Sequence, residues 1–150
     1  MSLLNSLKNW YKGWDGELTV KLGQWLYLGK KTYHVFNNVT LPMFGGGTTQ
    51  IDHIIVSIYG IFVVETKNMN GWIYGNAKEP KWTQVFFSKK YPFQNPLRQN
   101  YKHIKTISEL LKMPENKFHS IIFFIGNCKL QTNMPENVLL KGYTKYIKSK

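Results

Sequence analysis

The chain is poor in cysteine, and it lacks long hydrophobic runs. Cys128 is the only cysteine, so neither an intramolecular disulfide nor a Cys-x-x-Cys metal clip can form. No apolar run reaches the roughly 20 residues that a membrane-spanning helix needs. The N-terminus also lacks the continuous apolar core and the small-residue cleavage site of a signal peptide. We therefore expect no transmembrane segment, a cytoplasmic location, and a Cys128 that packs as a small hydrophobic side chain.

Acidic residues and arginine are also scarce, whereas lysine is abundant. The 20 basic and 8 acidic residues give a formal net charge of +12 and a pI near 9.8. Such a balance favours a polyanionic partner, either nucleic acid or an anionic membrane. Arg98 is the only arginine. Because lysine acts as a point charge on phosphate while arginine reads guanine edges, we expect backbone binding with weak sequence preference. A solubilising role for the lysines is the alternative.

The length and the composition fit one modest domain with a helical extension. The chain has 150 residues, of which 43% are hydrophobic and 15% aromatic, enough to bury a core. Leucines and aromatics recur at helical spacing in residues 1–14, which predicts an amphipathic extension before a domain over residues 15–150. This helix can contact a membrane surface or a partner, although core packing gives the same pattern. A second helix is predicted over residues 16–28, with Asp15 as its N-cap.

The remaining pattern predicts a run of strands, then a helix, then another strand. We expect strands at residues 33–41, 48–57, 60–67, 71–75 and 82–87, and later at 120–125 and 138–140. Asn95 and Pro96 are a strong helix start, and Pro114 ends that helix. The fold class is therefore α/β with a mixed sheet. Lysines interleave with Trp82 and Tyr91, which predicts either base stacking or strands packed on a core.

The second and third of these strands carry two acids and a lysine that can form a site. Glu65 and Lys67 are two residues apart, so they project from one face of a strand, about 7 Å apart at Cα. In the hairpin before them, a turn at Ile58 and Tyr59 would place Asp52 opposite Glu65, and a turn one residue later would place it opposite Lys67. Either register brings the three side chains to one face, whereas a three-residue turn would do so only with a bulge. Two carboxylates and an amine suit metal-assisted attack on a phosphate ester.

Several other residues have both a structural and a functional interpretation. Glu17 in the first turn of its helix is favourable there without any catalytic role. Gln99 lies off the apolar stripe of the helix after Asn95, as a solvated surface residue would. His53 should face away from Asp52 and serve packing or a hydrogen bond. The candidate nucleic-acid-binding residues are Lys78, Lys81, Lys89, Lys90, Arg98 and Lys102.

Taken in order, these motifs resemble a known family. The residues that carry the resemblance are Gly16 and Glu17, residues 36–39 (FNNV), residues 50–53 (QIDH), residues 60–67 (GIFVVETK), Gly71 with Trp72, and Asn95 and Pro96 with Gln99. This pattern is similar to that of the nuclease-related domain (NERD), a branch of the PD-(D/E)xK nuclease superfamily. The resemblance runs from about residue 13 to residue 125.

The resemblance implies a fold, a site and an activity. The fold is a restriction-endonuclease-like core of helix, three strands, helix and strand, with a mixed central sheet flanked by helices. Asp52 and Glu65 are the implied metal ligands, Lys67 lies beside the attacking water, and Glu17 and Gln99 support the site. Two close carboxylates repel each other unless a cation neutralises them, and hard oxygen ligands favour Mg²⁺ or Mn²⁺. Glu17 is a further candidate ligand of the ion.

The sequence therefore predicts a metal-dependent nuclease that hydrolyses phosphodiester bonds of nucleic acid, with DNA as the expected substrate and little sequence specificity. Two alternatives stay open. One is a nucleic-acid-binding module without catalysis on the same fold, and the other is a membrane-surface or assembly protein that uses residues 1–14. Nothing in the sequence specifies the oligomeric state.

Overall fold

The computed structural model describes residues 33–150, and residues from His34 onward form one compact unit. Both helices predicted before residue 29 lie outside the described residues. In chain order the elements are β1 (Tyr33–Pro42), β2 (Thr48–Ser57), β3 (Gly60–Asn68), β4 (Gly71–Tyr74), β5 (Lys81–Phe86), β6 (Lys89–Gln94), α3 (Pro96–Leu111), η2 (Glu115–Lys117), β7 (Phe118–Ile125), β8 (Cys128–Leu130), β9 (Val138–Leu139) and α4 (Tyr143–Lys148).

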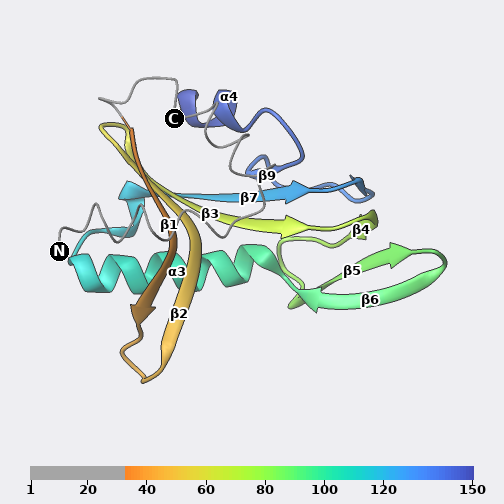
Figure 1. Cartoon of the computed structure of the whole chain (residues 1–150), viewed down its shortest axis with the longest axis horizontal. Helices are drawn as coiled ribbons and strands as arrows, with labels where there is room; N and C mark the ends of the chain where they lie inside the picture. The colour runs from red at the N-terminus through yellow and green to blue at the C-terminus, as the bar shows by residue number, and fades with distance from the viewer. Residues whose placement is uncertain (1–32) are drawn as a thin grey trace. The chain divides into compact units, whose positions relative to one another are not determined.

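The larger of the two sheets has five strands in the order β1-β2-β3-β7-β9 (Figure 1). Strands β2 and β3 form the predicted antiparallel hairpin, and Ser57 pairs with Gly60 across a turn at Ile58 and Tyr59. Strand β3 then pairs with β7 in parallel, and β7 pairs with β9 in parallel. Strands β3 and β7 are central, and β7 and residues 61–64 of β3 are largely apolar, as expected for parallel strands covered on both faces. The sheet is mixed, as predicted.

The smaller sheet continues two strands of the larger one past a shared break. Its order is β6-β5-β4-β8, with β4 following β3 and β8 following β7. The offset between partners is the same on both sides of the break, since Asn68 pairs with Ile125 and Gly71 pairs with Cys128. Gly71 has φ +88° at this break, and a Cβ there would collide with the carbonyl oxygen of Val85. The break lets the second sheet leave the plane of the first.

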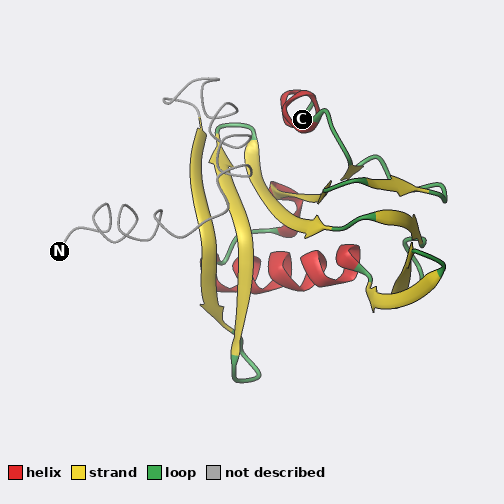
Figure 2. Cartoon of the chain, turned by 45° about the vertical axis from the view of Figure 1, so that its right-hand side comes forward, coloured by secondary structure: helices red, strands yellow, loops and turns green. Residues whose placement is uncertain are grey.

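Helix α3 crosses one face of the larger sheet (Figures 1 and 2), where it contacts β2, β3 and β7. Its start follows the predicted signals. The Asn95 side chain accepts from the Leu97 N–H at 2.9 Å, and Pro96 occupies the first turn, where it has no N–H to satisfy. The Asn95 amide also donates to the Glu79 carbonyl at 2.7 Å. One buried side chain thus joins the helix start to the loop between β4 and β5.

Two apolar clusters hold these elements together. The first joins the larger sheet to α3 and contains Ile51, Ile54, Ile61, Val63, Ile104, Ile107 and Phe118. The second lies between the smaller sheet and β7 and contains Ile73, Trp82, Ile122, Phe124, Cys128 and Val138. Cys128 is a buried free thiol whose pKa is raised by burial, so its predicted role as a small hydrophobic residue is confirmed. Trp82 is fully buried, which decides its role in favour of core packing.

The described fold agrees with the prediction in class and differs in detail. It is a mixed α/β structure, and its main strands and α3 lie where the sequence predicts them. Strands β6 and β8 and helix α4 were not predicted. Helix α4 follows the strand predicted at 138–140, and the ring centroids of its Tyr143 and of Phe123 lie 5.1 Å apart. Within residues 33–150, no helix has both the length and the apolar character needed to cross a bilayer.

The buried contacts of Asn100 predict that this side chain fixes α3 to the sheet. Its buried amide donates to the Val63 carbonyl and to Ser120 Oγ, both at 2.8 Å, so it joins the helix to β3 and β7. Asn100→Ala leaves these buried acceptors without their donor, and we expect the free energy of unfolding to fall by about 2–3 kcal/mol. Chemical denaturation measures this loss. Asn116→Ala in η2, at an exposed asparagine, is the control, and an equal effect of both substitutions would contradict the assignment.

Candidate functional site

Glu65, Lys67 and Gln99 form one polar cluster where β3 meets the first turn of α3. Lys67 Nζ donates to Glu65 Oε1 at 2.7 Å and to Gln99 Oε1 at 3.0 Å. Glu65 is buried, with 3% of its surface exposed, whereas the Lys67 side chain is 20% exposed. The shared face of Glu65 and Lys67 follows from the strand period, as predicted. Gln99 is half-buried against this pair, so its interpretation as a solvated surface residue is wrong.

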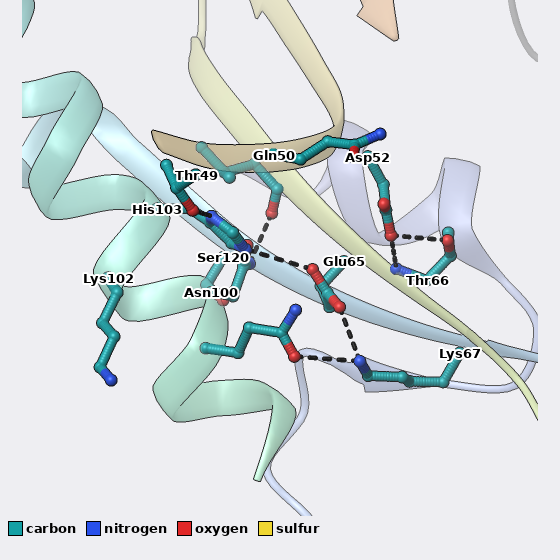
Figure 3. A network of polar contacts seen from close by, with 12 residues as sticks. Thr49, Gln50, Asp52, Glu65, Thr66, Lys67, Asn100, Lys102, His103 and Ser120 are labelled. Carbon is teal, nitrogen blue, oxygen red and sulfur yellow. Dashed lines mark hydrogen bonds and ion pairs between the residues drawn. The ribbon is translucent and has the colours of Figure 1, made fainter. Parts of the chain in front are cut away.

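His103 lies behind Glu65, on the side away from Lys67 (Figure 3). Its Nε2 is 3.4 Å from Glu65 Oε2, and its Nδ1 is 3.0 Å from Thr49 Oγ1. When the Thr49 hydroxyl donates to Nδ1, the ring carries its proton on Nε2 and presents it toward Glu65. The Glu65 carboxylate therefore has a cation on one side and a histidine N–H on the other.

Asp52 lies at a break in the alternation of β2, and this changes where its carboxylate goes. Thr49 and Ile51, at odd positions of the strand, face α3. Ile54 and Val56, at even positions, face it too, which strict alternation does not allow. The face therefore switches at Asp52 and His53, as at a β-bulge. Asp52 Oδ2 accepts from both the N–H and the Oγ1 hydroxyl of Thr66, each at 2.8 Å (Figure 3).

The hairpin register is thus the predicted one, but the prediction that alternation places all three side chains on one face is wrong for Asp52. Its bonded oxygen lies toward Thr66, whose side chain alternates with those of Glu65 and Lys67. The physical reason is the unpaired N–H of Thr66. The regular β2–β3 pairing extends only to His53 and Val64, and the Asp52 carboxylate takes the N–H that the ladder leaves open.

The two acids have opposite pKa shifts. Burial raises the pKa of Asp52, and the charge of Glu65 adds to this rise, while the Thr66 hydrogen bonds lower it in part. Burial alone would also raise the pKa of Glu65, but His103 and Lys67 outweigh it, so the pKa of Glu65 lies below its usual value. The charged form of Glu65 is therefore favoured, whereas the charged form of Asp52 is disfavoured by burial and by the charge of Glu65. A bound cation would favour the charged form of Asp52.

The donor set fits a hard divalent cation, as far as the described residues extend. Glu65 Oε2 is buried, and among the described residues it faces only His103 Nε2, at a long 3.4 Å. Asp52 Oδ1 takes part in neither bond to Thr66. Carboxylate oxygens of this kind suit Mg²⁺ or Mn²⁺. Between residues 33 and 150, no three His, Cys, Asp or Glu side chains are grouped to hold a metal. Glu17, the third predicted ligand, lies outside the described residues.

His53 has the structural role predicted for it. It is fully buried on β2, and its Nδ1 is 2.6 Å from Asn37 Oδ1 on β1. Burial lowers its pKa to about 4, and the nearby charge of Glu65 offsets this only in part. The imidazole is therefore neutral near pH 7 and bridges neighbouring strands.

The predicted phosphate-binding residues fall in three places. Lys81, Lys89 and Lys90 are exposed on the smaller sheet. Lys78 is exposed in the loop before β5, and its carbonyl accepts from the Arg98 guanidinium, so the only arginine holds that loop to α3. Lys102 is exposed on α3, one residue before His103 (Figure 3). On α3, Arg98 and Lys102 are the sequence neighbours of Gln99 and His103, the two helix residues that contact the Glu65–Lys67 pair.

Sequence reasoning missed His103, Thr49 and Asn100. A signal for His103 was present, because residues four apart lie on one helix face and His103 follows Gln99 by four. For Thr49 no such signal existed, since its contact depends on the switch of face at Asp52. Asn100 is adjacent to Gln99 but turns into the core, where its fixed amide holds the helix against the sheet.

The fold and the site together define a mixed α/β protein with an Asp in the middle of one strand and a Glu-x-Lys group near the end of the neighbouring strand. The sequence model of the nuclease-related domain matches residues 12–125, and the chain belongs to this family, as the resemblance indicated. An uncharacterized protein of Bacillus anthracis is 50% identical over 112 residues, which cover 73% of this chain. The chain spans about half, 53%, of that relative's length. No solved structure matches the chain.

The lowered pKa of His53 predicts how the stability of the protein depends on pH. The pKa of His53 is about 4 in the folded state and 6.5 for an ordinary histidine, which represents the unfolded chain. Between pH 4 and pH 6.5 the unfolded chain therefore binds a proton that the folded chain does not. Stability from this group is present above pH 6.5 and is lost toward pH 4, by about 3 kcal/mol. Urea unfolding between pH 7.5 and pH 4 measures the slope. His53→Gln should flatten it, whereas His34→Gln, at an exposed histidine, should not.

Proposed function

We propose that this protein is a metal-dependent nuclease that hydrolyses phosphodiester bonds of nucleic acid, with DNA as the expected substrate. The observation that carries the proposal is the ion pair of buried Glu65 with Lys67, beside Asp52, in a member of the nuclease-related domain family. Ion pairs are common in proteins, but a buried carboxylate whose second oxygen has only a long 3.4 Å contact with His103 Nε2 is costly for folding alone. Such a group is better explained by a ligand.

Asp52 and Glu65 are the proposed metal ligands, with Glu17 as a third. When bound there, Mg²⁺ or Mn²⁺ supplies Lewis-acid chemistry toward phosphate oxygens and water. Glu65 would contribute Oε2, because its other oxygen already accepts from Lys67. His103 and Thr49 keep the carboxylate oriented from behind. Asp52 would contribute the oxygen that takes part in neither Thr66 bond.

Lys67 is proposed to orient the attacking water and to stabilise the negative charge that develops on the phosphate oxygens. An ammonium has three donors, and Glu65 and Gln99 accept two of them. The third donor remains for a water or a phosphate oxygen, and the partial exposure of the side chain keeps it within reach of solvent. Gln99 holds the ammonium in place without adding charge, so it acts as a positioning residue.

The finer description of the fold belongs to the same proposal. Strands β1, β2 and β3, helix α3 and strand β7 follow each other in the order of the restriction-endonuclease-like core, once β4, β5 and β6 are set aside as an insertion. The first helix of that core would come from residues 16–28, within a domain over residues 15–150. The scarcity of arginine supports binding through phosphates with little sequence specificity.

A cleavage assay with paired variants tests the proposed activity. We expect the full chain to cut DNA only with Mg²⁺ or Mn²⁺, and Glu65→Gln or Lys67→Ala to slow cutting at least about 100-fold, since each removes charge from the reacting centre. Lys105 and Glu115 form an exposed ion pair of similar length, 2.8 Å. Lys105→Ala and Glu115→Gln therefore make the same chemical changes away from the site, and both should cut as the parent does.

The same variants separate the nuclease from a binding module without catalysis. Lost cutting with retained DNA binding supports the enzyme. If the parent, the site variants and the surface variants all bind DNA and none of them cuts it in either metal, the enzyme is excluded and the binding module remains.

Metal binding can be tested apart from activity. Thermal unfolding of the full chain should shift to higher temperature on adding Mg²⁺ or Mn²⁺, because a ligand that binds only the folded state stabilises it, by about 2.7 kcal/mol at 100 times Kd. Asp52→Asn and Glu65→Gln should each remove this shift. Asn at residue 52 can still accept from Thr66, so the variant keeps its fold. An unchanged metal-dependent shift in both variants would contradict the assigned ligands.

A further inference from the structure

The smaller sheet has a solvent-facing side that the site does not use. Strand pairing places Lys129, Trp72, Val85 and Lys90 in one row across β8, β4, β5 and β6. By alternation, Tyr74 and Lys81 lie on the same side as this row. The opposite side carries Ile73 and Trp82, which are fully buried in the second apolar cluster. The row therefore belongs to the outer face of the sheet.

The outer face combines an exposed aromatic ring with positive charge. Trp72 is 51% exposed and lies between Lys129 and Val85 in this row. Lys129 lies one strand away and Lys90 two strands away, at about 5 Å and 10 Å. Strands β4, β5, β6 and β8 contain no acidic residue, so no carboxylate of this sheet neutralises these lysines.

A second exposed ring lies at the tip of the β5–β6 hairpin, where it packs at 4.3 Å against Phe86 rather than on the row of Trp72. Strands β5 and β6 are joined by Phe87 and Ser88, which have φ of 46° and 61°, the geometry of a type I′ turn. Neither residue is the asparagine or glycine that such a turn favours. Phe87 is 84% exposed, so the hairpin carries a phenyl ring in solvent beyond the lysines. The hairpin is the outermost part of the smaller sheet in Figure 1.

From these observations we propose that the outer face of the smaller sheet binds single-stranded nucleic acid. Trp72 stacks on an unpaired base, and Lys90 and Lys129 neutralise the neighbouring phosphates. A flat aromatic ring beside cations on a sheet recognises a base only when that base is free to leave its own stack, which favours a single strand over a duplex. Lysine without arginine explains why the face would not read sequence. The proposal deepens the proposed function by naming the form of its substrate.

A binding experiment with the full chain in EDTA tests this face without hydrolysis. The probe is a fluorescently labelled oligothymidylate, and its anisotropy reports Kd for the parent, Trp72→Ala and Trp72→Phe. Loss of one stacking partner should weaken binding about tenfold in Trp72→Ala, and Trp72→Phe should restore part of it. Tyr59→Ala is the matched control, because Tyr59 is 56% exposed in the β2–β3 turn, and it should bind as the parent does.

Two further measurements make the test specific. Lys90→Gln should lower the slope of log K against log salt by about 0.7, the value for one phosphate contact on a single strand. A duplex of the same length should bind more weakly than the oligothymidylate and should be insensitive to Trp72→Ala. Equal effects of Trp72→Ala and Tyr59→Ala, or a duplex that depends on Trp72 as strongly as the single strand does, would overturn the proposal.

This outcome is separable from that of the nuclease proposal. Hydrolysis of the small phosphodiester bis(p-nitrophenyl) phosphate with Mn²⁺ needs the site but not the outer face, so Trp72→Ala should hydrolyse it at the parent rate. A parent that binds through Trp72 but hydrolyses nothing overturns the nuclease and keeps the single-strand face. A parent that hydrolyses the diester but binds the single strand equally well without Trp72 keeps the nuclease and overturns the single-strand face.

Discussion

The site depends on keeping the carboxylate of Glu65 charged while it is buried. Burial alone would favour the protonated form, and the Lys67 ammonium at 2.7 Å and the nearby His103 ring reverse that preference. Lys67 is placed by the strand period, but Gln99 and His103 come from α3. The ionisation of Glu65 therefore requires the helix to lie where it does, and Asn95 and Asn100 hold it there.

The break in strand pairing at Asp52 is the second constraint. Where the ladder between β2 and β3 stops, the Asp52 carboxylate satisfies the Thr66 N–H, and the same change of parity turns Thr49 toward His103. One irregularity thus arranges the hydrogen bond behind Glu65 and leaves Asp52 with a raised pKa beside a second acid. A perfectly regular strand would provide neither. Among the proposed metal ligands of the described residues, Asp52 is then the one at which regular pairing and site geometry conflict.

Much of this could be predicted from the sequence, because the signals were local. The period of two on β3 gave the shared face of Glu65 and Lys67, and Asn95 with Pro96 gave the start of α3. The hairpin register was one of two that parity allowed. What could not be predicted depends on contacts distant in sequence or on broken patterns. The bulge at Asp52 has no composition signal, and β8 is only three residues long and exists because β4 offers it an edge. Strand β6 contains Pro92, which argues against a strand except at an edge, where it lies.

The most direct test of the account is a crystal structure of the full chain with Mn²⁺, recorded at a wavelength where manganese scatters anomalously. The account predicts an anomalous peak bounded by Glu65 Oε2 and the Asp52 carboxylate, with Lys67 still bonded to Glu65 Oε1. Fully occupied manganese elsewhere, with Asp52 still on Thr66 and Glu65 Oε2 still without a ligand, would contradict it.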